Sequence, residues 1–199
     1  MMSTKITLAS KSIARAAILA SAQIAFDTVV SGVDEDAVKA EMLAAGFSAR
    51  DIAEALAERK AVEVSRHHTG LVVGADQTLE FAGKLYDKAE NLEVARDRLK
   101  MLRGQTHNLH AAVVVAEDGV AIWRETITAV LTMRPFSDEF LEAYLSEEGS
   151  DVLGSVGCYR LEGLGAQLFS VIKGDYFAIL GLPLMGLLQL LRRQNVLAE

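Results

Sequence analysis

One aspartate stands out because an apolar run leads directly to it. Residues 71–75 read LVVGA, the composition of a buried strand, and Asp76 follows at once. We therefore expect Asp76 at the carboxyl end of that strand, where open α/β sheets usually bind ligands. A buried carboxylate is costly unless a cation or several hydrogen-bond donors meet it. An aspartate that closes a turn through its own backbone fits the same pattern, so Asp76 alone does not identify a site.

A lysine on the apolar side of a helix is the second signal. Ser48 and Asp51 form a capping-box pattern that predicts a helix over residues 49–66. Lys60 falls four residues after Leu56 and so continues the apolar side of this helix. A lysine there either extends to the protein surface or pairs with an anion. The second alternative would place a cation near a buried carboxylate.

Three further charged residues gain meaning only in combination. Glu35 lies in an acidic segment before an alanine-rich helix, where pairing with the helix dipole explains it equally well. Arg15 lies in the first turns of a helix that Ser10 or Ser12 would cap, so its guanidinium either helps to bind an anion or is solvated. Lys88 follows a predicted turn, where lysines are usually solvated.

Several other kinds of site find little support in the sequence. His107 and His110 lack cysteine or acidic companions at metal-ligand spacing, so a zinc site is not expected. The segment Gly163-Leu164-Gly165 lacks the third glycine and the strand–helix context of a dinucleotide-binding loop. The sequence also has no phosphate-loop signature and no serine in a nucleophile-elbow pentapeptide.

The elements that must position these residues alternate between strands and helices in the first half of the chain. Strands are expected at residues 6–9, 24–30, 71–75, 110–116, 121–127 and 129–133. Helices are expected over residues 13–19, 36–46, 49–66, 92–104 and 137–146, and from Pro183 onward. Residues 154–184 suit short strands and loops. This order is typical of an α/β protein whose mixed sheet is covered by helices.

Composition favours a single domain over residues 1–199. The chain is 51% hydrophobic with only 2 prolines, which is enough for a sizeable core. The net charge of −7 argues against nucleic acid as a partner, because proteins that bind phosphate backbones usually have a basic surplus. A small anionic substrate would therefore need a local group of cations or a metal ion.

The sequence also favours a cytoplasmic protein without a membrane partner. Lys11 and Arg15 interrupt the apolar run that a signal peptide would need. The uncharged stretch at residues 176–191 is shorter than a membrane span and contains helix-breaking residues. The single cysteine, Cys158, cannot form an internal disulfide, which fits a reducing compartment.

Short motifs in a fixed order give the charged residues a common context. They are LASKSIAR at 8–15, VDE at 33–35, Lys60-Ala61, GAD at 74–76, DKA at 87–89, GQTH at 104–107, VGCYRLEG at 156–163 and GDYFAILGLPL at 174–184. With these motifs the chain resembles the Maf family, the septum-formation-inhibitor-like nucleoside triphosphate pyrophosphatases, from about Ile6 to Leu191. Each motif is short, but their shared order makes a chance match a poor explanation.

The resemblance implies a fold and an activity. Members of the family have an α/β fold related to the inosine-triphosphate pyrophosphatases, with an elongated mixed sheet and a cleft between two lobes. With a divalent metal cation, they hydrolyse a nucleoside triphosphate to the monophosphate and pyrophosphate. The resemblance therefore implies a nucleoside triphosphate as substrate and Mg²⁺ or Mn²⁺ as cofactor, and it is compatible with a homodimer.

The resemblance also implies roles for individual residues. The phosphate-binding and charged pocket residues of the family correspond by position to Ser10, Arg15, Glu35, Lys60, Asp76 and Lys88. Carboxylate oxygens of Glu35 and Asp76 suit Mg²⁺ or Mn²⁺, and the cationic side chains suit phosphates. Asp76 takes the place of the family's proton acceptor. Our working hypothesis is that Asp76 orients and deprotonates a water bound to the metal.

This chain departs from the family pattern where the family is linked to base selectivity. Gln77 replaces the usual threonine after the aspartate, and Glu162 replaces a glutamine, while Arg15 is retained. Ile13 and Ala14 replace a proline and the first of two arginines. A preference for thymidine or uridine triphosphate therefore does not transfer. An ionised Glu162 only accepts hydrogen bonds, so we expect a base that presents N–H donors, such as guanine, a modified guanine or cytosine.

Two other functions are compatible with the sequence. A nucleotide-binding regulator of cell division, with weak or vestigial hydrolysis, would explain the departures, although the charged residues needed for hydrolysis remain. A structural or interaction protein would carry the same charges as paired surface features and would not be stabilised by any nucleotide. Metal-dependent release of pyrophosphate separates catalysis from both alternatives.

Overall fold

The computed structural model describes residues 5–198 and forms a mixed sheet covered by helices on both faces. Within these residues the sheet has seven strands in the order β2-β1-β3-β5-β6-β7, and β4 pairs with β3 outside that path. The strands are β1 (Ile6–Leu8), β2 (Asp27–Thr28), β3 (Leu71–Phe81), β4 (Lys84–Tyr86), β5 (Thr106–Glu117), β6 (Val120–Met133) and β7 (Phe169–Lys173). The predicted α/β fold with a mixed sheet is therefore confirmed.

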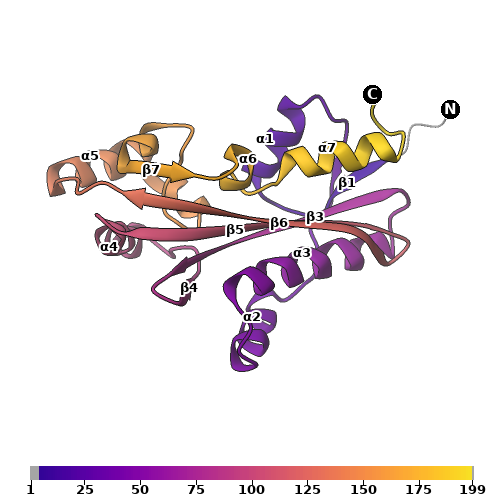
Figure 1. Cartoon of the computed structure of the whole chain (residues 1–199), viewed down its shortest axis with the longest axis horizontal. Helices are drawn as coiled ribbons and strands as arrows, with labels where there is room; N and C mark the ends of the chain where they lie inside the picture. Colours follow the sequence, from indigo (N-terminus) through magenta and orange to yellow (C-terminus); the bar gives the residue numbers. More distant parts are fainter. Residues whose placement is uncertain (1–4, 199) are drawn as a thin grey trace.

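The helices lie on both sides of the elongated sheet. They are α1 (Ile13–Ser21), α2 (Glu35–Ala44), α3 (Ala49–Ser65), α4 (Leu92–Leu102), α5 (Asp138–Glu148), α6 (Tyr176–Ile179) and α7 (Leu184–Arg193), with 3-10 helices at Gly149–Gly154 and Leu164–Leu168. Figure 1 shows α3 below the sheet and α1 and α7 above it. The long strands β3, β5 and β6 pair antiparallel, whereas β1 runs parallel to β3.

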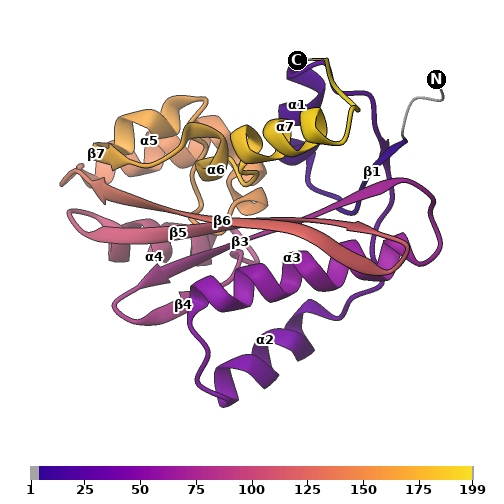
Figure 2. The ribbon, with the colours of Figure 1, turned by 45° about the vertical axis from the view of Figure 1, so that its right-hand side comes forward.

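Two large hydrophobic cores give the molecule two lobes. The first core lies with α4 and α5 at one end of the sheet and includes Leu99, Leu131 and Tyr144. The second lies with α1 and α7 at the other end and includes Leu8 and Leu187. Figure 2 shows α4 and α5 toward one end of the long strands and α1 and α7 toward the other. The continuous strands therefore fix the two lobes relative to each other.

Several predicted boundaries were wrong. Strand β3 does not end at Asp76 but runs to Phe81, because β5 pairs with it as far as Glu80 and a hairpin then leads into β4. The two strands predicted between residues 121 and 133 form the single strand β6. The strand predicted at 24–30 is reduced to Asp27–Thr28.

The apolar C-terminal segment packs on the sheet. It forms α6, a turn and α7, and Leu187 and Leu191 of α7 are fully buried. No helix within residues 5–198 has both the length and the apolar character needed to cross a membrane.

Candidate active site

A gap in strand pairing surrounds Asp76. On one edge of β3, β5 pairs with residues 72–80 without interruption. On the other edge, β1 pairs only with residues 71–73 and β4 only with residues 79–81. Among the described residues, no strand pairs with residues 74–78 on that edge. Asp76 is the middle residue of this gap, so the candidate site lies beside the middle of a strand instead of beyond its end.

Lys60 lies between two carboxylates. Its Nζ atom is 2.6 Å from Asp76 Oδ1 and 2.8 Å from Glu35 Oε1. Lys60 and Asp76 are both buried, at 5% and 6% exposure, whereas Glu35 is partly exposed. Burial alone would raise the pKa of Glu35, but the bond to Lys60 and the charges of Lys60, Lys39 and Arg15 outweigh it, so the net pKa is lowered. Of the two alternatives left open for Lys60, the structure shows the pairing with an anion.

A close approach of α3 to β3 places Lys60 over Asp76. The capping box of Ser48 and Asp51 forms as predicted and fixes the start of α3. Gly74 allows the contact, since a Cβ atom there would lie 2.2 Å from the carbonyl oxygen of Ala57. Lys60 therefore reaches the strand because Gly74, which has no side chain, lets the helix approach closely.

Ser10 comes to the site from the segment between β1 and α1, and Arg15 comes from the first turn of α1. Arg15 donates through Nη1 to Ser10 Oγ at 3.1 Å and through Nε to the carbonyl oxygen of Gly181 at 2.9 Å. Burial lowers the pKa of Arg15, although the nearby negative charges of Asp76 and Glu35 oppose this effect. Arg15 is thus a partly desolvated guanidinium near the two carboxylates.

Lys88 completes the group of charges that we call the charged cluster: Arg15, Glu35, Lys60, Asp76 and Lys88. Lys88 is exposed as a residue, but its ammonium group is partly desolvated. This desolvation, together with repulsion from Arg15, lowers the pKa of Lys88. The negative charges of Glu35 and Asp76 oppose the shift without cancelling it. The five members come from five separate segments of the chain.

Two neighbours of the cluster were not predicted from the sequence. Lys39 on α2 pairs with Asp87 at 2.6 Å and with Asp36 at 3.5 Å. Lys39 lies one helical turn after Glu35, and this i,i+4 spacing could have revealed that both point to the same side of α2. Asp87 belongs to the motif around Lys88, but nothing in its local sequence points to a partner 48 residues away.

Two of the three predicted specificity residues, Gln77 and Glu162, lie outside this group of contacts, whereas Arg15 belongs to it. Gln77 faces the side of the sheet opposite to Asp76, because successive strand residues alternate, and its Nε2 donates to the carbonyl oxygens of Ala178 and Ile179, both at 2.9 Å. Glu162 is 3.5 Å from Arg160 Nε and is exposed. The contacts in the described chain do not bring Glu162 to the cluster, so its role stays a prediction.

Glu35 and Asp76 are suitable in chemistry for a divalent cation. Their oxygens converge on the same Lys60 ammonium, which shows that one cationic centre can be reached by both. Within residues 5–198, no group of three or more histidine, cysteine or acidic side chains is arranged to hold a metal. Mg²⁺ is often held by one or two carboxylates together with substrate phosphates and water. This pair of carboxylates therefore fits a cation that binds together with a phosphorylated substrate.

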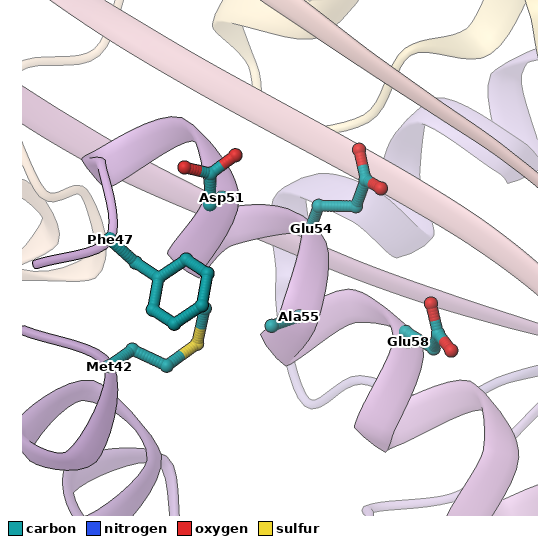
Figure 3. Close-up of a pocket in the computed structure, with 6 residues that line it drawn as sticks. All are labelled: Met42, Phe47, Asp51, Glu54, Ala55 and Glu58. Atoms are coloured by element: carbon teal, nitrogen blue, oxygen red, sulfur yellow. The ribbon is translucent and has the colours of Figure 1, made fainter. Parts of the chain in front are cut away.

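A pocket between α2 and α3 has a different character. Figure 3 shows its lining residues, which are Met42, Phe47, Asp51, Glu54, Ala55 and Glu58. The carboxylate of Asp51 caps α3, that of Glu54 accepts from Thr126 at 2.7 Å, and that of Glu58 pairs with Arg124 at 3.0 Å. All three acidic groups already have partners within the chain, and this pocket provides no functional group for catalysis.

The fold and the charged cluster together define an α/β protein with charged side chains from five segments gathered beside one strand. The family model described as Maf-like protein matches residues 5–194. The chain therefore belongs to the Maf family, as the sequence motifs predicted.

Relatives cover nearly the full length of the chain. It is 58% identical over 194 residues to a nucleoside triphosphate pyrophosphatase of Caulobacter vibrioides, covering 98% of both chains. It is 47% identical to a nucleoside triphosphate pyrophosphatase of Hyphomonas neptunium, over 98% of this chain and 99% of the relative. It is also 44% identical to a 7-methyl-GTP pyrophosphatase of Brucella abortus, again over 98% of each chain.

Proposed function

We propose that this protein is a nucleoside triphosphate pyrophosphatase that hydrolyses its substrate to the monophosphate and pyrophosphate. The observation that carries the proposal is the buried contact of Lys60 with both Glu35 and Asp76, close to Arg15 and Lys88. The names of its relatives support the same activity. The cluster combines an oxygen base with cations that can bind a phosphate chain.

The proposed chemistry begins with Asp76. Lys60 binds Oδ1 of this carboxylate, so we assign Oδ2 to the water that attacks the α-phosphorus. As that water attacks in line with the departing pyrophosphate, Asp76 accepts its proton. Strand β3 holds the base rigidly because β5 pairs with the residues before Asp76 and with those after it along the same edge.

The cationic residues bind the phosphate chain. Arg15, Lys60 and Lys88 would hold the phosphate oxygens and stabilise the negative charge that develops on the leaving pyrophosphate. A divalent cation held by Glu35 and Asp76 would neutralise further charge on the phosphates. Arg15, Lys60 and Lys88 bind and orient the substrate, whereas Asp76 contributes both to holding the cation and to accepting the proton.

We further propose a preference for a base rich in N–H donors, with 7-methylguanine as the leading candidate. Both hydrogen atoms of the Gln77 amide point to carbonyl oxygens of α6, which leaves the amide oxygen as the group available to a ligand. Glu162 likewise offers acceptors, and its negative charge would attract the cationic 7-methylguanine ring. The name of the relative from Brucella abortus supports this choice.

Release of pyrophosphate from a panel of nucleoside triphosphates, including 7-methyl-GTP, tests both proposals. With Mg²⁺ or Mn²⁺ present, Asp76→Asn should lower kcat by about 10²–10⁴-fold, the usual contribution of a general base. A chelator should abolish turnover by the wild type.

Near-full activity of Asp76→Asn at saturating metal would disprove the role of Asp76 as the base. Clear preference for thymidine or uridine triphosphate would disprove the proposed base selectivity.

The same panel separates catalysis from the regulatory alternative. A vestigial enzyme would still be stabilised by nucleotides in thermal unfolding but would release no pyrophosphate. A structural protein would show neither effect. Binding should persist in Asp76→Asn, because the residues that bind the phosphates are intact in that variant.

A further inference from the structure

Asp87 is held from two directions. Its carboxylate receives Lys39 Nζ from α2 at 2.6 Å. Its backbone carbonyl oxygen receives Arg98 Nη1 from α4 at 2.8 Å, and the same nitrogen also donates to the carbonyl oxygen of Val156. The Arg98 guanidinium in turn lies over the Tyr86 ring, 4.9 Å from its centroid. Asp87 therefore links α2 of one lobe to α4 and the loop at residue 156 of the other.

This link adjoins the charged cluster along the chain at two points. Lys39 lies one turn after Glu35 on the same side of α2, so fixing Lys39 also restrains the first turn of α2, which carries Glu35. Asp87 directly precedes Lys88, so holding Asp87 restricts the backbone from which Lys88 extends. Neither Lys39 nor Asp87 makes a contact with Lys60 or Asp76 in the described structure, which indicates an indirect role.

We propose that the Lys39–Asp87 ion pair is a positioning device that holds Lys88 and Glu35 at the correct separation to bind the triphosphate and its metal. The inference rests on the proposed function, since it assigns the pair to substrate binding. Asp87 and Lys39 are positioning residues: the first acts through Lys88 and the second through Glu35. Loss of the pair would leave the loop at residue 88 held from α4 alone, through Arg98, while the proton-accepting Asp76 stays in place.

The test compares steady-state kinetics of the wild type with Asp87→Ala, Lys39→Met and Lys88→Met, using the best triphosphate of the panel with saturating Mg²⁺. We expect Asp87→Ala and Lys39→Met to raise KM about tenfold while kcat changes less than about threefold, because a lost phosphate contact weakens ground state and transition state alike. Lys39→Met breaks the pair from the other side and keeps the test valid if Asp87→Ala does not fold.

A double variant distinguishes positioning from general destabilisation. If Asp87 acts through Lys88, adding Asp87→Ala to Lys88→Met should raise KM less than twofold further. Asp27→Ala is a matched control, because Asp27 also pairs with a lysine, at 2.8 Å from Lys5, and its side chain is similarly exposed at 63% against 58% for Asp87. This control should leave KM unchanged.

Three results would overturn the inference. They are an unchanged KM in both Asp87→Ala and Lys39→Met, a fully additive effect of Asp87→Ala on Lys88→Met, or an equal rise of KM in Asp27→Ala. In each case a wild type that releases pyrophosphate leaves the proposed function standing. A wild type without activity on every triphosphate would instead disprove the proposed function, and the inference with it.

Discussion

At the scale of single residues, Lys60 determines what the carboxylates around it can do. A buried aspartate is stable only when its charge is compensated, and here a single ammonium group contacts both Asp76 and Glu35. The helical spacing of Lys60 predicted that it points to the apolar side of α3, and this is confirmed. Its partners were not evident from spacing alone, because Glu35 and Asp76 lie on other elements.

Lys60→Met should destabilise the protein by about 3 kcal/mol or more at neutral pH, because it leaves a buried carboxylate without its counter-charge. Urea unfolding followed by circular dichroism measures this change. The double variant Lys60→Met with Asp76→Asn removes the buried charge together with its partner and should recover much of the loss. A double variant no more stable than Lys60→Met would show that the cost comes from lost packing.

His107 should make stability depend on pH. It is 2% exposed, with Nε2 2.8 Å from the Tyr159 hydroxyl, and burial lowers the pKa of His107 from 6.5 to about 4. Between pH 6.5 and about 4, the unfolded chain binds a proton at His107 that the folded chain does not. Stability is therefore lost as the pH falls through this window, by about 3 kcal/mol in all.

His107→Gln provides the comparison for this pH effect, because glutamine does not titrate. Urea unfolding at pH 7 and at pH 4.5 should show a smaller loss of stability in the variant than in the wild type. Carboxylates that titrate in the same range affect both proteins and cancel in the difference. An equal loss in both proteins would contradict the lowered pKa.

At the scale of elements, the site depends on a gap that the sequence does not reveal. The apolar run before Asp76 predicted a strand, and this is confirmed, but the strand continues to Phe81. Where it ends depends on pairing with β5 and β4, which are distant in sequence or joined by a turn. Local patterns specify that a strand forms, whereas the gap beside residues 74–78 arises from which strands pair with it.

Gly74→Ala should disturb both stability and activity because it pushes α3 away from β3. The added Cβ would lie 2.2 Å from Ala57 O and 2.8 Å from Ala61 Cβ, so the helix that carries Lys60 must move. We expect a loss of about 1–3 kcal/mol in unfolding free energy and a lower kcat/KM. Gly154→Ala is the control, since no atom lies within 4 Å of its added Cβ, and it should change stability by less than about 0.5 kcal/mol. Equal effects of the two substitutions would contradict this account.

At the scale of the whole molecule, the charged cluster draws on both lobes. Arg15, Glu35 and Lys60 come from elements at the end with α1, α2 and α3, whereas Lys88 precedes α4 at the other end. Family motifs predicted that these residues belong to one site, and the structure brings them together. The Lys39–Asp87 and Arg98 contacts that join the lobes were not predictable, because each depends on tertiary packing.

Because the ligand would contact residues of both lobes, it should stabilise them together. At 100 times its Kd, a non-hydrolysable triphosphate analogue with Mg²⁺ should raise the unfolding free energy by about 2.7 kcal/mol. Trp123, the only tryptophan of the chain, packs against the core with α1 and α7, so its fluorescence reports on that lobe, whereas circular dichroism reports on helices of both. The two midpoints in urea should shift equally, as expected for a cooperative transition.

The corresponding nucleoside without phosphates is the control and should shift neither midpoint. A shift seen by fluorescence alone would show that the ligand binds one lobe only, and the picture of a site shared across the sheet would be wrong.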